Sequence, residues 1–192
     1  MNYCSHCGAP VVLRIPEGDT LPRHVCPSCG TVHYQNPKVV VGCLVEWNNR
    51  VLLCRRAIDP RRGYWTLPAG FLENRETTLQ GAVRETLEEA QAQVTDAALF
   101  SLLNVSHINQ IHIFYRARLV DGAFAAGHET LEADLFAEGD IRWQELAFPT
   151  VLFTLERYYQ DRRNRRFGVH IEDISADAWR KLGLTGGGAG HS

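Results

Sequence analysis

Three glutamates spaced i, i+3 and i+4 are the residues of this chain best suited to chemistry, namely Glu85, Glu88 and Glu89. On a helix, where each residue advances about 100°, their carboxylates lie within about one quarter of the helical wheel. In water they repel one another by a few tenths of a kcal/mol per pair, unless a divalent cation binds among them. A set of oxygen ligands favours Mg²⁺ or Mn²⁺. We therefore predict a site for one of these ions.

The local sequence supplies the helix that this arrangement needs. Thr77 and Gln80 form a Thr-x-x-Gln capping box, which predicts a helix from residue 77 to about residue 90. We expect its apolar face to lie on the core, opposite the glutamates. That face consists of Leu79, Val83, Leu87 and Ala90. The alternative for such a helix is an acidic face that is merely solvated.

Further positions around the glutamates follow a known pattern, G-x5-E-x7-R-E-U-x-E-E-x-G-U, where U is a bulky aliphatic residue. The matching residues are Gly70, Glu76, Arg84, Glu85, Glu88 and Glu89. The chain therefore resembles the Nudix hydrolases in a specific motif. It departs from the pattern at Thr86, Gln91 and Ala92, none of which removes a carboxylate or the arginine.

The resemblance implies a fold and a reaction. The fold is an α/β Nudix sandwich, with a mixed sheet between helical layers. The reaction is hydrolysis of a nucleoside diphosphate linked to another moiety X, which gives AMP and X-phosphate when the nucleoside is adenosine. By the same resemblance Arg84 and Glu76 brace the loop and helix by ion pairing. The carbonyl of Ala69 is a candidate additional ligand of the Mg²⁺ or Mn²⁺.

Two C-x-x-C turns near the N-terminus predict a second metal site. Cys4 and Cys7 form one turn, Cys26 and Cys29 the other, and together they are typical of a tetrahedral structural zinc site. Two redox dithiols are the alternative. His6 is a candidate to replace one cysteine. The chain between the turns is too short to fold without a metal.

The length of 192 residues, 45% of them hydrophobic, suits one main domain with a small appendage. We expect a zinc ribbon over residues 1–36, a Nudix domain over 37–168 and a C-terminal extension over 169–192 with a disordered end at 185–192. The strands expected in the Nudix domain are residues 39–47, 51–55, 99–105, 111–119 and a short apolar run at 133–137, followed by a helix over 150–163.

Several residues are candidates for substrate contact or catalysis outside the motif. A group of arginines precedes the metal site and suits phosphate, because guanidinium binds phosphate with two hydrogen bonds. These arginines are Arg55, Arg56, Arg61 and Arg62. Trp65 or Tyr115 could stack on a nucleobase, although both are more often core residues. Glu129 or Glu132 could add a metal ligand or act as the general base.

The order of the two domains limits the range of substrates that we expect. A zinc ribbon followed by a Nudix domain resembles a subgroup associated with NADH, ADP-ribose and FAD pyrophosphatases. The NADH-hydrolysing members carry an SQPWPFPxS motif downstream of the signature, and residues 93–149 contain nothing like it. The expectation is therefore ADP-ribose or FAD. Two alternatives stay open: an RNA-directed enzyme acting on a nucleotide cap, and a non-catalytic module that senses a nucleotide or binds a protein.

The overall charge argues against nucleic acid as a general partner. The formal net charge is −2, which gives no broad affinity for a polyanion. The sequence has no apolar run long enough for a membrane span and no signal peptide at residue 1. We expect a cytoplasmic protein with reduced cysteines and a small nucleotide substrate, and a homodimer is left open.

Overall fold

The structure, a computed structural model, describes residues 1–181 and divides into two compact units, with the boundary between Pro37 and Lys38. The first unit holds a three-stranded antiparallel sheet in the order β1-β2-β3. Its strands are β1 (Val12–Arg14), β2 (Arg23–Val25) and β3 (Val32–His33). Few side chains are buried here, mainly Cys4, Val25 and Cys26, so the apolar core alone is too small to stabilise this unit.

The second unit is built on one eight-stranded mixed sheet, ordered β10-β5-β4-β9-β8-β11, with β6 beside β5 and β7 beside β4. Its strands are β4 (Lys38–Trp47), β5 (Arg50–Arg56), β6 (Trp65–Thr66), β7 (Ala69–Phe71), β8 (Val94–Val105), β9 (Gln110–Leu119), β10 (Thr130–Phe136) and β11 (His170–Asp173). Its helices are α1 (Thr78–Ala90), α2 (Pro149–Asn164) and α3 (Ala176–Lys181), with 3-10 turns η1 (Ser106–Ile108), η2 (Glu138–Asp140) and η3 (Trp143–Glu145).

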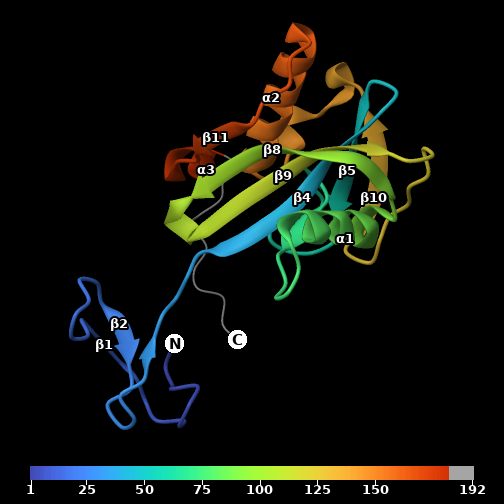
Figure 1. The fold of residues 1–192 in the computed structure, drawn as a ribbon. Coiled ribbons are helices and arrows are strands. Elements are labelled where there is room, and N and C mark those ends of the chain that lie inside the picture. The colour runs from blue at the N-terminus through green and yellow to red at the C-terminus, as the bar shows by residue number, and fades with distance from the viewer. Residues whose placement is uncertain (182–192) are drawn as a thin grey trace. The chain divides into compact units, whose positions relative to one another are not determined.

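Helices cover both faces of this sheet, as Figure 1 shows for α1 and α2. Successive residues of β4 point to opposite faces, because side chains alternate along a strand. Val41 and Cys43 lie in a buried cluster with Ala82 of α1, and Leu44 lies in a second cluster with Leu155 of α2. The predicted α/β/α sandwich with a mixed sheet is confirmed.

The core face of α1 differs from the expected one. Ala82, Thr86 and Ala90 are buried, whereas Leu79 and Leu87 are 37% and 50% exposed. The expected apolar face was therefore right at Ala90 and wrong at Leu79 and Leu87. Small side chains let the helix lie close to β4, so the buried face is the one that also carries the half-buried carboxylates. The capping box is present as predicted, with both of its hydrogen bonds made.

The chain after α2 belongs to the same sheet. β11 pairs in parallel with β8, and α3 places Trp179, 6% exposed, in the core beside α2. Neither element was expected. The expected disordered end, residues 185–192, lies outside the described residues. Among residues 1–181 no helix is both long enough and apolar enough to cross a lipid bilayer.

Candidate functional site

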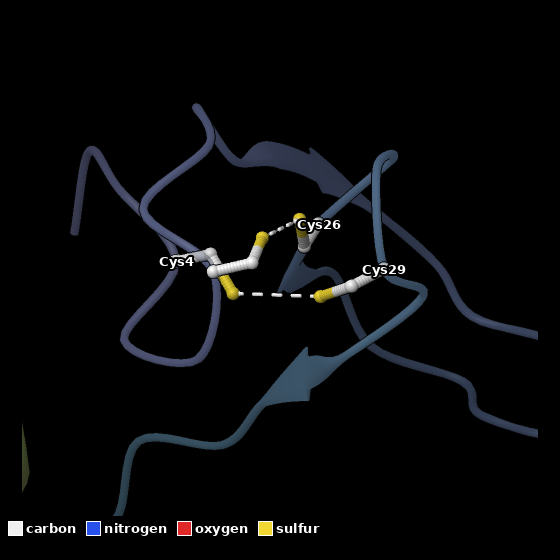
Figure 2. Close-up of side chains that lie close together, drawn as sticks. Cys4, Cys26 and Cys29 are labelled. Carbon is white, nitrogen blue, oxygen red and sulfur yellow. Dashed lines mark hydrogen bonds between the residues drawn. The ribbon is translucent and has the colours of Figure 1, made fainter.

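The four cysteines of the first unit meet at one point. Their sulfur atoms all lie within 4.8 Å of one another, with Cys4 to Cys29 at 3.7 Å and Cys7 to Cys26 at 3.5 Å (Figure 2). Zinc bound to four thiolates at about 2.3 Å places the sulfurs about 3.8 Å apart. The two C-x-x-C turns therefore have the dimensions of a closed tetrahedral site.

A histidine that the sequence did not single out contacts this cluster. Nε2 of His33 lies 3.3 Å from the sulfur of Cys4, whereas His6 approaches the same sulfur only through its backbone amide. His33 stood in the segment expected to be a linker, and its pairing with His24 across β2 and β3 brings it back to the cysteines. Spacing alone gave no signal for this contact.

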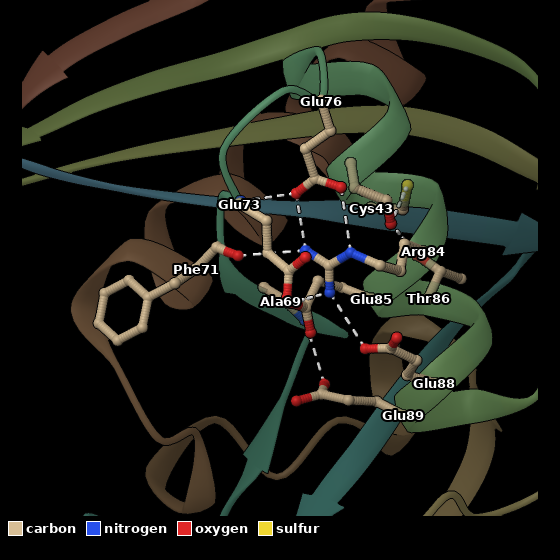
Figure 3. Close-up of polar contacts among 11 residues, drawn as sticks. Cys43, Ala69, Phe71, Glu73, Glu76, Arg84, Glu85, Thr86, Glu88 and Glu89 are labelled. Atoms are coloured by element: carbon tan, nitrogen blue, oxygen red, sulfur yellow. Dashed lines mark hydrogen bonds and ion pairs between the residues drawn. The ribbon is translucent and has the colours of Figure 1, made fainter.

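Arg84 organises the second site from the middle of α1, as Figure 3 shows. It donates two hydrogen bonds to the carboxylate of Glu76, at 2.7 and 3.1 Å, and one to the carbonyl of Phe71 at 3.2 Å. Its third nitrogen donates to Glu85 at 2.6 Å and to Glu88 at 3.0 Å. The guanidinium thus ties the loop before the helix to two of the three glutamates.

Gly70 explains how close the loop comes to the helix. A β-carbon at this position would overlap the carboxylate of Glu85, so any other residue would displace this carboxylate from its place. Burial raises the pKa of Glu85, against the opposing effect of Arg84. The glycine of the motif is thus explained by the space that this carboxylate needs.

Glu89 is the most strongly perturbed acid of the site. One oxygen accepts a hydrogen bond from the amide of Ala69 at 3.1 Å. Burial, together with the smaller effects of the charges of Glu85 and Glu129, nevertheless raises its pKa to about 8, against this hydrogen bond and the charge of Arg56. A carboxylate held in this environment gains from a bound cation.

The loop between β9 and β10 brings a further carboxylate to this group. The amides of Ala125 and Gly127 donate to the carbonyls of Ala90 and Glu89, each at 2.9 Å. These are carbonyls that a helix C-terminus leaves without partners. The chain then passes Glu129, whose charge acts on Glu85, Glu89 and Arg56.

Glu132 has a different neighbour. Its carboxylate pairs with Arg55 at 3.5 Å, and both side chains are about half exposed. A register shift between Thr130 and Glu132 interrupts the pairing of β10 with β5 at this point. The two candidates that the sequence left equal therefore have different surroundings, and Glu129 is the one whose charge acts on the motif carboxylates Glu85 and Glu89.

The four arginines before the motif have different surroundings. Arg55 donates through Nε to the carbonyl of Gly63 at 2.9 Å, and Arg61 lies over the ring of Tyr64 and donates to Leu146. Arg62 is exposed. Arg56 is half-buried, and its charge interacts with Glu89 and Glu129. Of the four, Arg56 is the one whose charge acts on a carboxylate of the motif, that of Glu89.

The two aromatic candidates lie in the core or against it. Trp65 is 5% exposed and packs edge-on against Phe136, with ring centroids 4.7 Å apart, in the core on the α2 side. It offers no face to a ligand, so its assignment to substrate binding is corrected. Tyr115 packs against the α1-side core, and its hydroxyl shares a 2.7 Å hydrogen bond with Thr78.

The carboxylates of the three motif glutamates lie farther apart than the four cysteine sulfurs do. Among residues 1–181 the cysteines are the one set of three or more potential ligands gathered within 4.8 Å. The reason is visible at Arg84, whose guanidinium binds Glu85 and Glu88 and lies between carboxylates that a cation would draw together. The buried acids and their raised pKa values fit a divalent ion. The ligand roles of Ala69 and the three glutamates stay predictions.

The departures from the motif are accommodated locally. Thr86 is fully buried and donates through its hydroxyl to the carbonyl of Ala82 at 2.7 Å. Gln91 takes the left-handed conformation, with φ 48°, that the usual glycine would adopt at the helix end. Its side chain donates to Ala126 at 3.0 Å. Ala92 is fully buried.

This fold, with carboxylates at the junction of a loop and helix, defines a Nudix protein, and comparison with protein families agrees. The family described as NUDIX domain matches residues 36–154, and the zinc ribbon described as Nudix N-terminal matches residues 2–35. The chain therefore belongs to the Nudix family.

The relatives of this chain carry the names of two different activities. A NAD-capped RNA hydrolase of Chromobacterium violaceum is 37% identical over 93 residues, which cover 48% of this chain and 33% of the relative. An ADP-ribose pyrophosphatase of Methanocaldococcus jannaschii is 30% identical over 109 residues, which cover 54% of this chain and 63% of the relative. The match thus spans less than two thirds of either relative.

One solved structure matches this chain over nearly the whole length of both proteins. A Nudix hydrolase of Nitrosomonas europaea is 53% identical, with a TM-score of 0.87, over 91% of this chain and 99% of that one. This agreement extends beyond the residues that the two family descriptions cover.

Proposed function

We propose that the protein is a Nudix pyrophosphatase that hydrolyses a nucleoside diphosphate linked to a second moiety, of the ADP-ribose or FAD type, and releases AMP and X-phosphate. The observation that carries this proposal is the position of Glu89. Its buried carboxylate lies among the charges of Glu85, Glu129 and Arg56, beside the loop that the motif places against α1.

Each side chain has a distinct part in this proposal. Glu85, Glu88 and Glu89 would hold Mg²⁺ or Mn²⁺, which when bound neutralises charge on the diphosphate and acidifies a water molecule. A carboxylate oxygen of Glu129 would accept the proton of the attacking water. Arg56 would donate hydrogen bonds to diphosphate oxygens.

Arg84 and Glu76 act through the others. The guanidinium is a positioning group, because it fixes the loop to the helix and orients Glu85 and Glu88. The zinc that the cysteine cluster fits would be structural, since four thiolates leave no coordination position open for a substrate.

The test is a substrate comparison with Mg²⁺ and with Mn²⁺. We expect kcat/KM for ADP-ribose or FAD to exceed that for any nucleoside triphosphate, with AMP as one product, and NADH to be poor. Glu89→Gln measured in parallel shows whether turnover depends on the site. Preference for a triphosphate with release of pyrophosphate, or for NADH, would refute the proposed substrate class.

A second candidate substrate is NAD-capped RNA. It is favoured by the name of the Chromobacterium violaceum relative, which matches 48% of this chain, while the net charge of −2 gives no general attraction for RNA. A capped and an uncapped RNA of the same sequence, assayed beside ADP-ribose, distinguish the two. Efficient release of the cap with weak ADP-ribose turnover would favour the RNA substrate.

A further inference from the structure

The terminal nitrogens of the Arg56 guanidinium form no hydrogen bond or ion pair with residues 1–181. Its Nε donates to the carbonyl of Pro60 at 2.8 Å, and this is the hydrogen bond that the Arg56 side chain makes within residues 1–181. Its charge acts on Glu89 and Glu129. A guanidinium in this state can offer its terminal nitrogens to a diphosphate, provided that its plane is held in one orientation.

Phe148 is the side chain that supports the guanidinium. The ring of Phe148 lies 5.1 Å from the central carbon of Arg56, within the range of a cation–π contact. The backbone of Phe148 is fixed independently, because it is the N-cap of α2 and its carbonyl accepts from Val151 and Leu152 at 3.1 Å. What remains to be fixed is the direction of the ring.

Trp179 fixes that ring. The two rings stack, with centroids 6.0 Å apart and planes 25° from parallel. Trp179 is itself held edge-on by His107, at 5.3 Å, and is 6% exposed. It comes from α3, which the amide of Ile174 helps to anchor by donating to Asn104 of β8 at 2.8 Å.

α3 lies outside the residues matched by the Nudix domain family, which end at 154. We propose that Trp179 is a positioning residue for the reaction, which through Phe148 orients Arg56 toward the diphosphate of the substrate. The segment after the matched domain would then contribute to the active site without touching the substrate. This inference rests on the proposed function, because it assigns Arg56 to diphosphate binding.

The test compares two substitutions that differ in the ring. Trp179→Leu keeps an apolar side chain but loses stacking, whereas Trp179→Phe keeps an aromatic ring. We expect KM for ADP-ribose to rise about tenfold in the leucine variant and less than about threefold in the phenylalanine variant, with kcat changed less than about twofold in both.

Two controls separate positioning from general destabilisation. Leu155→Ala removes a fully buried side chain of α2 from the same core cluster; it should lower thermal stability and leave KM within about twofold of wild type. In Arg56→Gln the further change Trp179→Leu should have no additional effect on KM, since the group that Trp179 orients is gone. Equal, additive KM changes in both backgrounds would overturn the inference.

Calorimetric binding of inorganic pyrophosphate to the Mg²⁺-loaded protein keeps this inference separate from the choice of substrate. If ADP-ribose and FAD are not hydrolysed, the proposed function fails, but Trp179→Leu should still weaken pyrophosphate binding about tenfold. Unchanged pyrophosphate affinity in Trp179→Leu, or no pyrophosphate binding by the wild type, would overturn the positioning role.

Discussion

The amide of Ala69 donates a hydrogen bond to Oε2 of Glu89 across 3.1 Å, and so joins β7 to the last turn of α1. A single donor favours the charged carboxylate, but burial outweighs it, and the pKa of Glu89 rises to about 8. Without a metal, Glu89 is therefore protonated at neutral pH. Binding of a divalent cation must displace this proton.

The stability of the metal-free protein should consequently fall as pH rises. Between the ordinary pKa of 4.5 and about 8, the folded protein holds a proton that the unfolded chain has lost, so the free energy of unfolding decreases through this window. Glu89→Gln should remove this decrease and be about 1–3 kcal/mol more stable than wild type above pH 8. Chemical denaturation with chelator present, at several pH values, measures the difference.

The same variant should be inactive. Glu89→Gln and Glu88→Gln are each expected to lower kcat by about a thousandfold or more, because each removes a charged metal ligand. Steady-state kinetics over a range of Mg²⁺ concentrations provides the measurement. Turnover at the wild-type rate in both variants would contradict the assignment of the metal site.

Glu129 and Glu132 form a matched pair for testing the general base. Glu129→Gln should lower kcat by about a hundredfold or more, since its charge acts on Glu85 and Glu89. Glu132→Gln should change kcat less than about threefold, because Glu132 pairs with Arg55 at the surface. If Glu132→Gln lowers kcat more than Glu129→Gln does, Glu132 and not Glu129 is the candidate general base.

Arg84→Lys should be costly despite keeping the charge. Arg84 donates hydrogen bonds to Phe71, Glu76, Glu85 and Glu88, and an ammonium cannot reach all of them. We expect kcat to fall about 10- to 100-fold. Arg142→Lys, in an exposed ion pair with Glu145, is the control and should have near wild-type kcat. Equal kcat in both variants would show that Arg84 does not position the carboxylates.

The first unit should carry one zinc per chain. Elemental analysis of protein purified without added metal checks this. Cys26→Ser should lose the zinc and unfold the first unit, whereas Cys43→Ala, buried in the α1-side core of the second unit, should retain the zinc. A well-folded ribbon that contains no metal would contradict the assignment.

Local signals in the sequence predicted much of this fold. The capping box at Thr77 predicted the start of α1, and the strand expected over residues 39–47 is observed as β4 (Lys38–Trp47). The helix expected over residues 150–163 was also confirmed, as α2 (Pro149–Asn164). In each case the signal lies within a few residues of the element that it describes.

Features that depend on contacts between segments far apart in the sequence could not be predicted from local signals. The face of α1 was misassigned because large apolar residues were counted, while the close approach of Ala82 to β4 depends on small ones. β11 is short and mostly exposed, so it has no apolar period of its own. Trp65 is core and Glu129 lies at the site because of contacts with segments far along the chain.

The docking of the β9–β10 loop on α1 has a consequence for how the site opens. Ala125 and Gly127 satisfy the carbonyls of Ala90 and Glu89, and Gln91 holds Ala126. Lifting this loop would break these hydrogen bonds and leave the carbonyls to water, at the helix end that carries the carboxylates. The loop and the last turn of α1 therefore form one cooperative unit in local unfolding. Glu129 and the residues proposed to bind metal would lose and regain their arrangement together.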